Sequence, residues 1–243
     1  MIVEDERIKV KMKIMVVTGA SSGVGKATAL RFANERYKVC VLARSTKKLE
    51  ALATESAGEI YIYPTDVSDS DSVEKTFEKI LGDHGCIDVL VNNAGVTTAG
   101  KPIDYEMIDR IIDTNLKGAL YCTYAAIPSM RKQGSGHIIN VASIAGVDIS
   151  AKGSDGLYAA SKHGMVAFSE SIGKKYRKEG ILVTALCPGG IDTPLWNDEN
   201  PYPNDKSDMI RPEEVADLIA YILAQPKRTL FKNVIFVPVV EQW

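Results

Sequence analysis

Short apolar runs alternate with helical patterns along most of the sequence, and this alternation restricts the fold more than any other feature. The apolar runs have the length of strands and lie at 14–17, 39–43, 60–63, 89–91, 137–141, 182–186 and 234–240. Helical patterns lie between them at 26–37, 47–56, 105–132, 157–179 and 212–223, and residues 66–83 read as a loop followed by a helix. Strands that are apolar on both faces and separated by helices are typical of a parallel sheet covered on both sides. We therefore predict an α/β fold with a doubly wound parallel sheet of about seven strands.

The 243 residues contain no linker, low-complexity run or short repeat that would divide them. We predict one domain over 1–243, with residues 1–12 as an N-terminal extension. The extension carries acidic residues and no apolar core, so we do not expect a secretory signal peptide. Residues 192–208 are rich in Pro, Asn and Asp, and we expect them to form a mobile loop beside the substrate.

Charge, hydropathy and cysteine usage exclude several classes of partner. The 29 basic and 31 acidic residues give a net charge of −2, which provides no basic footprint for nucleic acid. No stretch reaches the roughly 18 apolar residues that a membrane helix needs. Cys40, Cys86, Cys122 and Cys187 are scattered without a Cys-x-x-Cys pair, so we predict neither a disulfide framework nor a metal site. These features favour a cytoplasmic protein with reduced thiols.

The turn after the first predicted strand is the first indication of function. It reads Thr-Gly-Ala-Ser-Ser-Gly-Val-Gly and leads directly into a helix. Glycines permit a tight turn and let backbone N–H groups approach a phosphate, while the helix N-terminus adds the positive end of its dipole. This arrangement predicts a Rossmann dinucleotide site, although the spacing is Gly-x-x-x-Gly-x-Gly rather than Gly-x-Gly-x-x-Gly. The predicted cofactor contacts in the turn are Gly19, Ser21, Ser22, Gly23, Val24 and Gly25.

The end of the second predicted strand distinguishes the two nicotinamide cofactors. NAD-binding proteins place a carboxylate here to accept a hydrogen bond from the ribose 2′-hydroxyl. This sequence has Arg44 instead, and a guanidinium suits a 2′-phosphate because it binds phosphate in bidentate fashion. Lys47 and Lys48 add positive charge nearby, although they could equally form an exposed helix face. We predict a preference for NADP(H), with use of NAD(H) left open.

With these pieces in view, the sequence resembles the short-chain dehydrogenase/reductase family from about residue 13 to the last predicted strand. The glycine turn is followed in family order by several further motifs. They are Asp66-Val67, the Asn-Asn-Ala-Gly run at 92–95, Asn115 in Thr-Asn-Leu-Lys-Gly, Ser143 in Asn-Val-Ala-Ser, Tyr158 and Lys162 in Tyr-Ala-Ala-Ser-Lys, and Pro188-Gly189 followed by Thr193. Each motif is weak alone, but the full set in order is specific.

The chemistry of the last motifs follows from their residue types. Tyr158 and Lys162 are four apart and share one face of a helix. An ammonium beside a phenol favours the phenolate, so Tyr158 can act as a general acid in reduction and a base in oxidation. Ser143, just beyond a strand end, can hydrogen-bond the substrate oxygen. The resemblance implies that Lys162 also binds the nicotinamide ribose, and that Asn115 positions a water that extends a proton relay from Lys162.

The resemblance also implies further cofactor contacts. Asp66 would face the adenine amino group and Val67 would donate a backbone N–H. Asn92, Ala94 and Gly95 would line the cofactor, and Pro188, Gly189, Ile191 and Thr193 would lie at the nicotinamide.

Three features depart from the common family pattern. The segment from Ser143 to Tyr158 is longer than usual, Ser22 stands where many NADP-preferring members have a basic residue, and the C-terminus lacks a Gly-rich segment that many tetrameric members carry. The longer segment borders the predicted substrate pocket. Trp243 could be an interface anchor or an exposed tail.

We predict an NADP(H)-dependent oxidoreductase that interconverts a carbonyl group, in a ketone, an aldehyde or a 3-oxo acid, and the corresponding alcohol. Its partners would be a small-molecule substrate and further copies of the chain in a homodimer or homotetramer, with neither nucleic acid nor membrane. Two alternatives remain open: an epimerase or dehydratase of the same fold, and a non-catalytic dinucleotide-binding sensor. The complete set of Ser143, Tyr158 and Lys162 argues against a sensor, which needs no acid/base pair.

Overall fold

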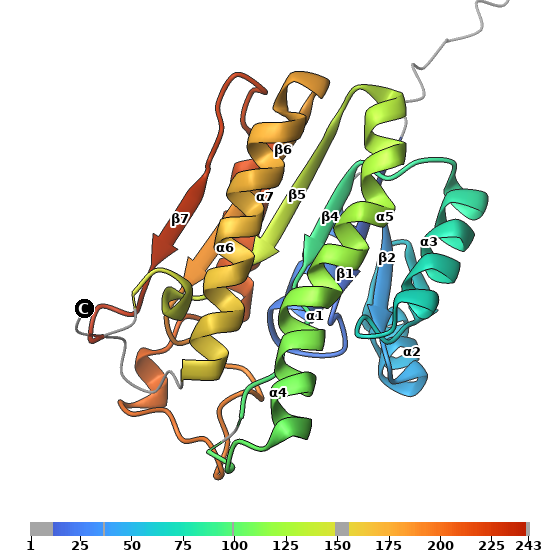
Figure 1. The fold of residues 1–243 in the computed structure, drawn as a ribbon. Helices are drawn as coiled ribbons and strands as arrows, with labels where there is room; N and C mark the ends of the chain where they lie inside the picture. The colour runs from blue at the N-terminus through green and yellow to red at the C-terminus, as the bar shows by residue number, and fades with distance from the viewer. Residues whose placement is uncertain (1–11, 36, 99, 149–155, 242–243) are drawn as a thin grey trace, which may run out of the picture.

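A computed structural model describes residues 12–35, 37–98, 100–148 and 156–241 (Figure 1). Its strands form one parallel sheet in the order β3-β2-β1-β4-β5-β6-β7. The strands are β1 Lys13–Thr18, β2 Tyr37–Ala43, β3 Ile60–Pro64, β4 Val89–Asn92, β5 Gly136–Val141, β6 Ile181–Pro188 and β7 Asn233–Phe236. The prediction of a doubly wound parallel sheet of seven strands is confirmed.

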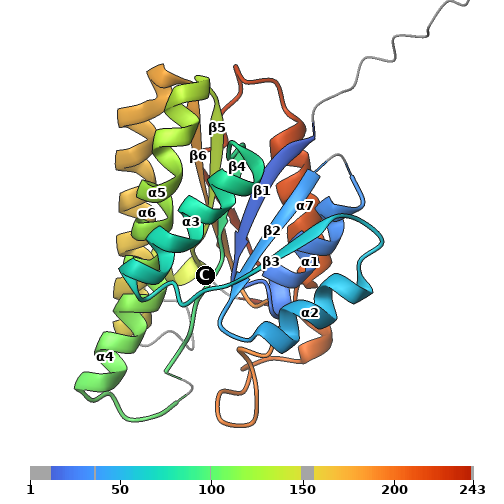
Figure 2. The ribbon, with the colours of Figure 1, turned by 90° about the vertical axis from the view of Figure 1, so that its right-hand side faces the viewer.

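Helices cover both faces of this sheet, as Figures 1 and 2 show. They are α1 Gly23–Ala33, α2 Thr46–Glu55, α3 Ser70–His84, α4 Tyr105–Ile112, α5 Gly118–Gln133, α6 Gly156–Tyr176 and α7 Pro212–Ala224. Alternate residues of β1 show why both layers form. Ile14 and Val16 pack with α3, α5 and α6, whereas Met15 and Val17 pack with α1, α2 and α7. Because successive strand side chains point to opposite faces, a fully apolar strand supplies both cores.

Several element boundaries differ from the predicted ones. The helix predicted from residue 26 begins at Gly23, inside the glycine turn. The predicted helix at 105–132 is interrupted by a π-helical segment, Asp113–Lys117. The last strand ends at Phe236 rather than at 240, because Pro238 has no N–H to donate to the ladder.

The sheet order creates a crevice where a ligand can bind. β1 has β2 on one side and β4 on the other, so the chain direction of the crossovers reverses between β1 and β4. In open α/β sheets, ligands bind outside the carboxyl ends of the strands at such a point. In Figure 1 the strand arrows point toward the lower side of the view.

Some predicted features fall wholly or partly outside the described residues. The extension at 1–12 is described only at Met12, Trp243 is not described, and the long segment before Tyr158 is not described at 149–155. Residues 192–208 are described as turns with a short 3-10 helix, Lys206–Asp208, and Ile191 forms a bridge with Ile210. The mobility of this loop stays a prediction. In the described ranges, no helix combines the length and apolarity that crossing a bilayer requires.

Candidate active site

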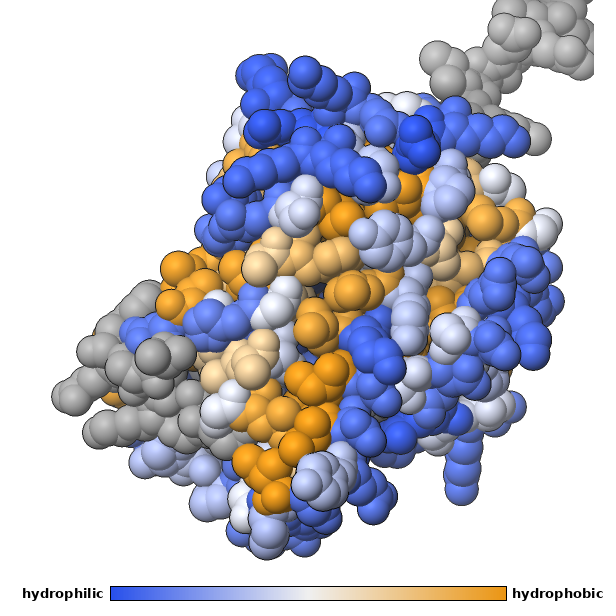
Figure 3. All heavy atoms as spheres, in the orientation of Figure 1, coloured by the Kyte–Doolittle hydropathy of each residue, from blue (hydrophilic) through white to orange (hydrophobic). Residues whose placement is uncertain are grey.

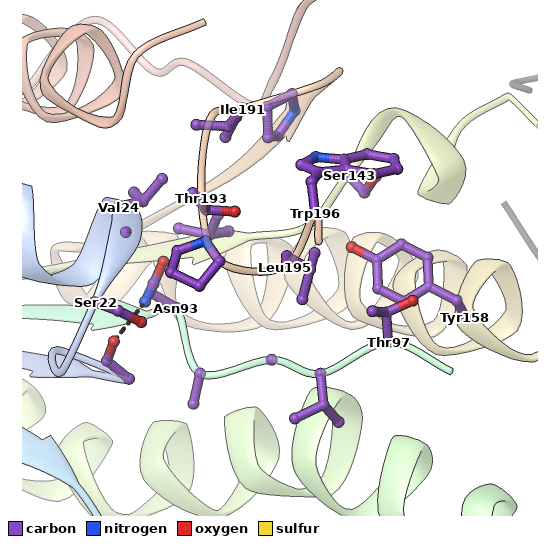
Figure 4. Close-up of a pocket in the computed structure, with 18 of the residues that line it drawn as sticks. Ser22, Val24, Asn93, Thr97, Ser143, Tyr158, Ile191, Thr193, Leu195 and Trp196 are labelled. Atoms are coloured by element: carbon purple, nitrogen blue, oxygen red, sulfur yellow. Dashed lines mark hydrogen bonds between the residues drawn. The ribbon is translucent and has the colours of Figure 1, made fainter. Parts of the chain in front are cut away.

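A cavity of about 630 Å³ lies at the carboxyl ends of the strands, around the β1/β4 switch point. Figure 4 shows part of its wall, with Ser22, Val24 and Asn93 at one side and Ser143, Tyr158 and Trp196 at the other. Seventeen of the predicted site residues line it: Gly19, Ser21, Ser22, Gly23, Val24, Arg44, Asp66, Val67, Ala94, Gly95, Ser143, Tyr158, Lys162, Pro188, Gly189, Ile191 and Thr193. The cavity wall does not include Gly25, Asn92 or Asn115.

The glycine turn has the geometry of a phosphate cradle. Gly19 has a φ of 65° and Gly23 a φ of 52°, both in the left-handed region that favours glycine. A Cβ on Gly25 would lie 2.5 Å from the Gly19 carbonyl oxygen, so Gly25 permits close packing of α1 on the turn rather than contact with the cavity. Ser22 caps α1 without a side-chain hydrogen bond, and the first turn holds no acidic residue. The N–H groups of this helix end therefore suit a phosphate.

The carboxyl ends of β1 and β4 are joined by polar contacts that the sequence motifs did not predict. Thr18 Oγ1 accepts hydrogen bonds from the backbone N–H groups of Asn93 and Ala94, each at 3.0 Å. Asn93 Nδ2 donates to the carbonyl oxygen of Thr18 at 3.0 Å. These contacts hold the glycine turn beside the segment that follows β4.

Asn92 points away from this cavity. Its side chain is buried and donates to Thr123 Oγ1 at 2.9 Å and to Asn140 Oδ1 at 2.8 Å. Asn93 lines the cavity instead. The period of two in a strand explains the difference, since neighbouring residues face opposite sides of the sheet.

Arg44 lies at the end of the cavity formed by β2 and the start of α2. Its side chain is exposed and forms no ion pair with any described residue, so the guanidinium is available to a ligand. Lys48 also lines this end of the cavity, and Lys47 does not. Asp66 lies there too, with its Oδ1 accepting hydrogen bonds from the backbone N–H and the hydroxyl of Ser68. The cations at this end fit an anionic group on the adenosine ribose.

Tyr158 and Lys162 extend from the first turns of α6 into the opposite part of the cavity, where Ser143 follows β5. Lys162 Nζ lies 5.7 Å from the centroid of the Tyr158 ring. It donates a hydrogen bond to the carbonyl oxygen of Val141 at 2.9 Å. Ser143 Oγ accepts from the N–H of Ala145 at 3.2 Å, which orients the hydroxyl at the strand end. The three side chains predicted to perform the chemistry are therefore brought to one cavity.

Asn115 is buried in the π-helical segment, where its side chain links two parts of the site. Its Oδ1 accepts from the N–H of Val96 at 2.8 Å, and its Nδ2 donates to the Val96 carbonyl oxygen at 2.9 Å. Nδ2 also donates to Ser161 Oγ, which itself donates to the carbonyl oxygen of Tyr158. Asn115 thus ties the segment after β4 to the helix that carries Tyr158, and its role in a water relay stays a prediction. π-Helical turns are frequent at functional sites.

Burial removes the Lys162 ammonium from water and so disfavours its charged form. Its side chain is almost fully buried, and this burial lowers its pKa from 10.5 to about 8. The lowered pKa has a consequence for stability. Between about pH 8 and pH 10.5 the unfolded chain binds more protons at this residue than the folded chain, so the free energy of unfolding rises with pH in that window.

We therefore expect the parent protein to gain stability between pH 7 and pH 10 relative to Lys162→Met, which has no titrating group at this position. The relative gain should be on the order of 3 kcal/mol, because each unit of pKa shift corresponds to about 1.4 kcal/mol. Urea unfolding of the cofactor-free proteins at each pH measures it. Lys178→Met removes an exposed lysine and serves as the control. A constant difference between the parent and Lys162→Met across this range would contradict the expectation.

The end of the cavity near Tyr158, where we expect the substrate and which we call the substrate end, was the least predictable part of the site. It includes side chains from the loop after β6 and from the segment after β7, and none of them belongs to a motif. They are Leu195, Trp196, Asn200, Tyr202, Val237, Val240 and Glu241. Only the Pro- and Asn-rich composition of 192–208 pointed to the first four, and no sequence signal pointed to the last three.

The described cysteines are buried and form no disulfide bond with one another. Within the described ranges, no group of three His, Cys, Asp or Glu side chains is placed to hold a metal ion.

Several known proteins are similar to this chain in sequence, and several solved structures have a similar fold. A family model described as short chain dehydrogenase matches residues 13–204. An uncharacterized oxidoreductase of Staphylococcus haemolyticus is 37% identical over 230 residues, which cover 93% of this chain and 97% of that protein. The structure of an alcohol dehydrogenase from the archaeon Thermococcus sibiricus, complexed with 5-hydroxy-NADP, superposes with a TM-score of 0.82 at 26% identity and covers 96% of this chain and 99% of its own. A metagenomic short-chain oxidoreductase in complex with NADP gives a TM-score of 0.80 at 30% identity, with 95% of this chain and 99% of that chain covered.

The match extends over most of the sequence and includes the glycine turn, Ser143, Tyr158 and Lys162. The chain therefore belongs to the short chain dehydrogenase family and is an NAD(P)-dependent enzyme.

Proposed function

We propose that this enzyme uses NADP(H) to interconvert a carbonyl compound and the corresponding secondary or primary alcohol. One observation carries the proposal: a single cavity joins the glycine turn and Arg44 at one end to Ser143, Tyr158 and Lys162 at the other. A ligand that spans it would need an anionic adenosine end and a reacting end. The structural relatives bound to NADP and 5-hydroxy-NADP support the same cofactor for this chain.

The residues have separate parts in the proposed reaction. NADP(H), when bound, supplies the hydride that adds to the carbonyl carbon, while the carbonyl is reduced and the nicotinamide oxidised. Tyr158 donates its phenolic proton to the carbonyl oxygen, and Ser143 donates a hydrogen bond to the same oxygen and orients it. Lys162 stabilises the phenolate left on Tyr158, which regains a proton from solvent. In the alcohol-oxidising direction Tyr158 accepts the proton instead.

The substrate end supports carbonyl compounds with an apolar substituent. Trp196 and Leu195 provide apolar surface at the same end of the cavity as Tyr158, as Figure 4 shows, and Ile144 also lines the cavity. A panel of a simple ketone (acetophenone), an aldehyde (benzaldehyde) and a 3-oxo ester (ethyl 3-oxobutanoate), each with NADPH and with NADH, tests the proposal. Consumption of NADPH with at least one member supports it. No turnover of any member, together with no binding of NADPH, would contradict it.

We also propose that the enzyme is a homodimer formed through the surface of α4, α5 and α6. Figure 3 shows apolar side chains gathered in a strip on this face. Tyr105, Ile108 and Tyr124 are exposed there, and the Tyr124 ring lies 6.0 Å from that of Phe168. Such an exposed apolar surface favours association of proteins. The buried cysteines, which form no disulfide bond with one another, support a reducing, cytoplasmic location for this assembly.

Tyr124→Glu should convert the proposed dimer into a monomer, because it places a charge on α5 among the exposed apolar side chains of the proposed interface. Sedimentation velocity measures the change in mass. Tyr221→Glu is the matched control, since Tyr221 is also an exposed tyrosine beside an aromatic ring, on α7 on the other face of the sheet. A parent protein that sediments as a monomer, or a Tyr124→Glu variant that remains dimeric, would contradict the proposed interface.

A further inference from the structure

The segment after β7 returns to the cavity and places one carboxylate in its wall. Glu241 lines the cavity together with Val237 and Val240. Its Oε1 accepts one hydrogen bond from the backbone N–H of Gly190 at 2.8 Å and a second from the hydroxyl of Tyr202 at 2.8 Å. Glu241 therefore joins three segments that are distant in sequence: the turn after β6, the loop at 192–208 and the segment after β7.

The two glycines after Pro188 make this close approach feasible. A Cβ on Gly190 would lie 2.7 Å from Glu241 Oε1 and 2.4 Å from a ring carbon of Tyr202. A Cβ on Gly189 would lie 2.2 Å from Glu241 Oε2. The carboxylate thus lies directly against the backbone of both glycines, in a space that any side chain would fill.

Tyr202 connects Glu241 to Trp196, at the substrate end of the cavity. It is 7% exposed, and its ring packs edge-on against Trp196 with 5.3 Å between the centroids. Burial, with a smaller contribution from the bond to Glu241, raises the pKa of Tyr202 to about 12, so the hydroxyl remains a donor at neutral pH. Trp196 in turn lines the cavity near Tyr158.

The part of the 192–208 loop between Trp196 and Tyr202 is held mainly by short-range hydrogen bonds within the loop. The backbone groups of Asn197 and Asn200 bond to each other, and Asn200 Nδ2 donates to the carbonyl oxygen of Leu195. An exposed ion pair between Lys101 and Glu199 adds a link to the segment after β4, and such pairs contribute little. The buried hydroxyl of Tyr202 on a carboxylate is a stronger link, because charge-assisted hydrogen bonds are about twice as strong as neutral ones.

We propose that Glu241 is a positioning residue for the carbonyl substrate: it holds Tyr202, and through it Trp196, against the turn at Gly190 and so fixes the wall that faces Tyr158. This role rests on the proposed function for its catalytic readout. It goes beyond that function in assigning part of substrate selection to the segment after β7. The carboxylate acts as an acceptor of two hydrogen bonds and does not touch the reacting atoms.

Three variants separate this role from a general loss of stability. Glu241→Ala removes the carboxylate that accepts the hydrogen bonds from Gly190 and Tyr202, and Glu241→Gln keeps an oxygen that can accept both. Tyr202→Phe removes only the hydroxyl that donates one of them. With the best carbonyl compound of the panel, Glu241→Ala should raise KM about tenfold or more, which matches the loss of a hydrogen bond to a charged group. The KM for NADPH should change less than threefold. In Glu241→Gln the KM for the carbonyl compound should rise by no more than half as much as in Glu241→Ala, on a logarithmic scale. The double variant Tyr202→Phe/Glu241→Ala should be no worse than Glu241→Ala alone, because both changes break one link.

The matched controls are Glu74→Ala and Tyr221→Phe, which remove an exposed carboxylate and an exposed phenol that do not line the cavity. Neither should change the KM for the carbonyl compound. Equal KM values for the parent and Glu241→Ala, or a Glu241→Gln enzyme as impaired as Glu241→Ala, would overturn the proposed role.

A second readout needs no substrate and no cofactor. The sequence holds two tryptophans, so in a Trp243→Phe background the emission comes from Trp196 alone. Glu241→Ala in that background should shift the Trp196 emission to the red as the loop opens to water, and Glu241→Gln should shift it less. An unchanged spectrum in Glu241→Ala would overturn the proposal even if the enzyme reduces carbonyl compounds. Conversely, failure of every carbonyl probe together with no binding of NADPH would contradict the proposed function and leave this spectroscopic test intact.

Discussion

Tyr158→Phe should reduce turnover of any accepted carbonyl compound by about 10³-fold, within the range that a general acid contributes. The substitution removes one oxygen and keeps the ring, which lies 5.7 Å from the buried ammonium of Lys162. The proton for the substrate oxygen would then have to come from water. Ser143 would still orient the carbonyl, and the glycine turn would still bind the cofactor.

The measurement is single-turnover NADPH oxidation together with a separate titration of NADPH binding. The affinity for NADPH should stay within about threefold of the parent, because the proposed cofactor contacts at Gly19, Gly23 and Arg44 lie elsewhere in the cavity. Tyr121→Phe, at a partly buried tyrosine of α5, is the matched control and should leave turnover unchanged. A Tyr158→Phe enzyme as fast as the parent would refute the proposed acid/base role.

Arg44→Asp should reverse the cofactor preference by raising the KM for NADPH about 10²- to 10³-fold. The guanidinium is exposed at the adenosine end of the cavity and forms no ion pair with any described residue, so its charge is available to a 2′-phosphate. A hydrogen bond to a charged group contributes about 1.5–3 kcal/mol, a guanidinium can donate two to one phosphate, and an aspartate adds repulsion of the phosphate. NADH lacks that phosphate, and the new carboxylate can accept a hydrogen bond from its ribose hydroxyl.

The ratio of kcat/KM for NADPH and NADH, measured with one carbonyl compound, reports the change. Lys47→Asp makes the same change of charge three residues further along, at a side chain that does not line the cavity, and should shift the ratio far less. The interpretation of Arg44 fails if the parent protein already uses NADH better than NADPH, or if Lys47→Asp and Arg44→Asp have equal effects.

The sequence was sufficient to predict the elements and residues that depend on local pattern. Val39–Val41 and Val89–Val91 are apolar on both faces because both faces of the sheet are covered, and this pattern is visible in one dimension. The glycine turn and the pair Tyr158/Lys162 are likewise contiguous, so their spacing alone places them on a turn and on one helix face.

Features that depend on three-dimensional packing were not predictable. Asn93 lines the cavity instead of the predicted Asn92. Which of the two does so depends on the side of the sheet that each side chain faces, and the sequence of an Asn-Asn pair does not specify this. The π-helical segment is part of an otherwise regular helical pattern, and the contacts that Asn115 makes from it, with Val96 and Ser161, join residues 19 and 46 positions apart. Glu241 reaches Gly190 across 51 positions of the sequence, and no local signal encodes that distance.

The pairing of β1 with β4 has a consequence for how the protein folds. Only three residue pairs, Met15–Val89, Val16–Leu90 and Val17–Val91, form this ladder, whereas β1 and β2 share six. The ladder and its flanking contact from Ile14 to Asp88 join segments 74 positions apart. Closing so long a loop costs entropy before the contacts form, which makes such pairings slow. Gly19 and Ala94, which approach each other at the end of this ladder, both line the cavity, so the binding site exists only once this long-range pairing has formed.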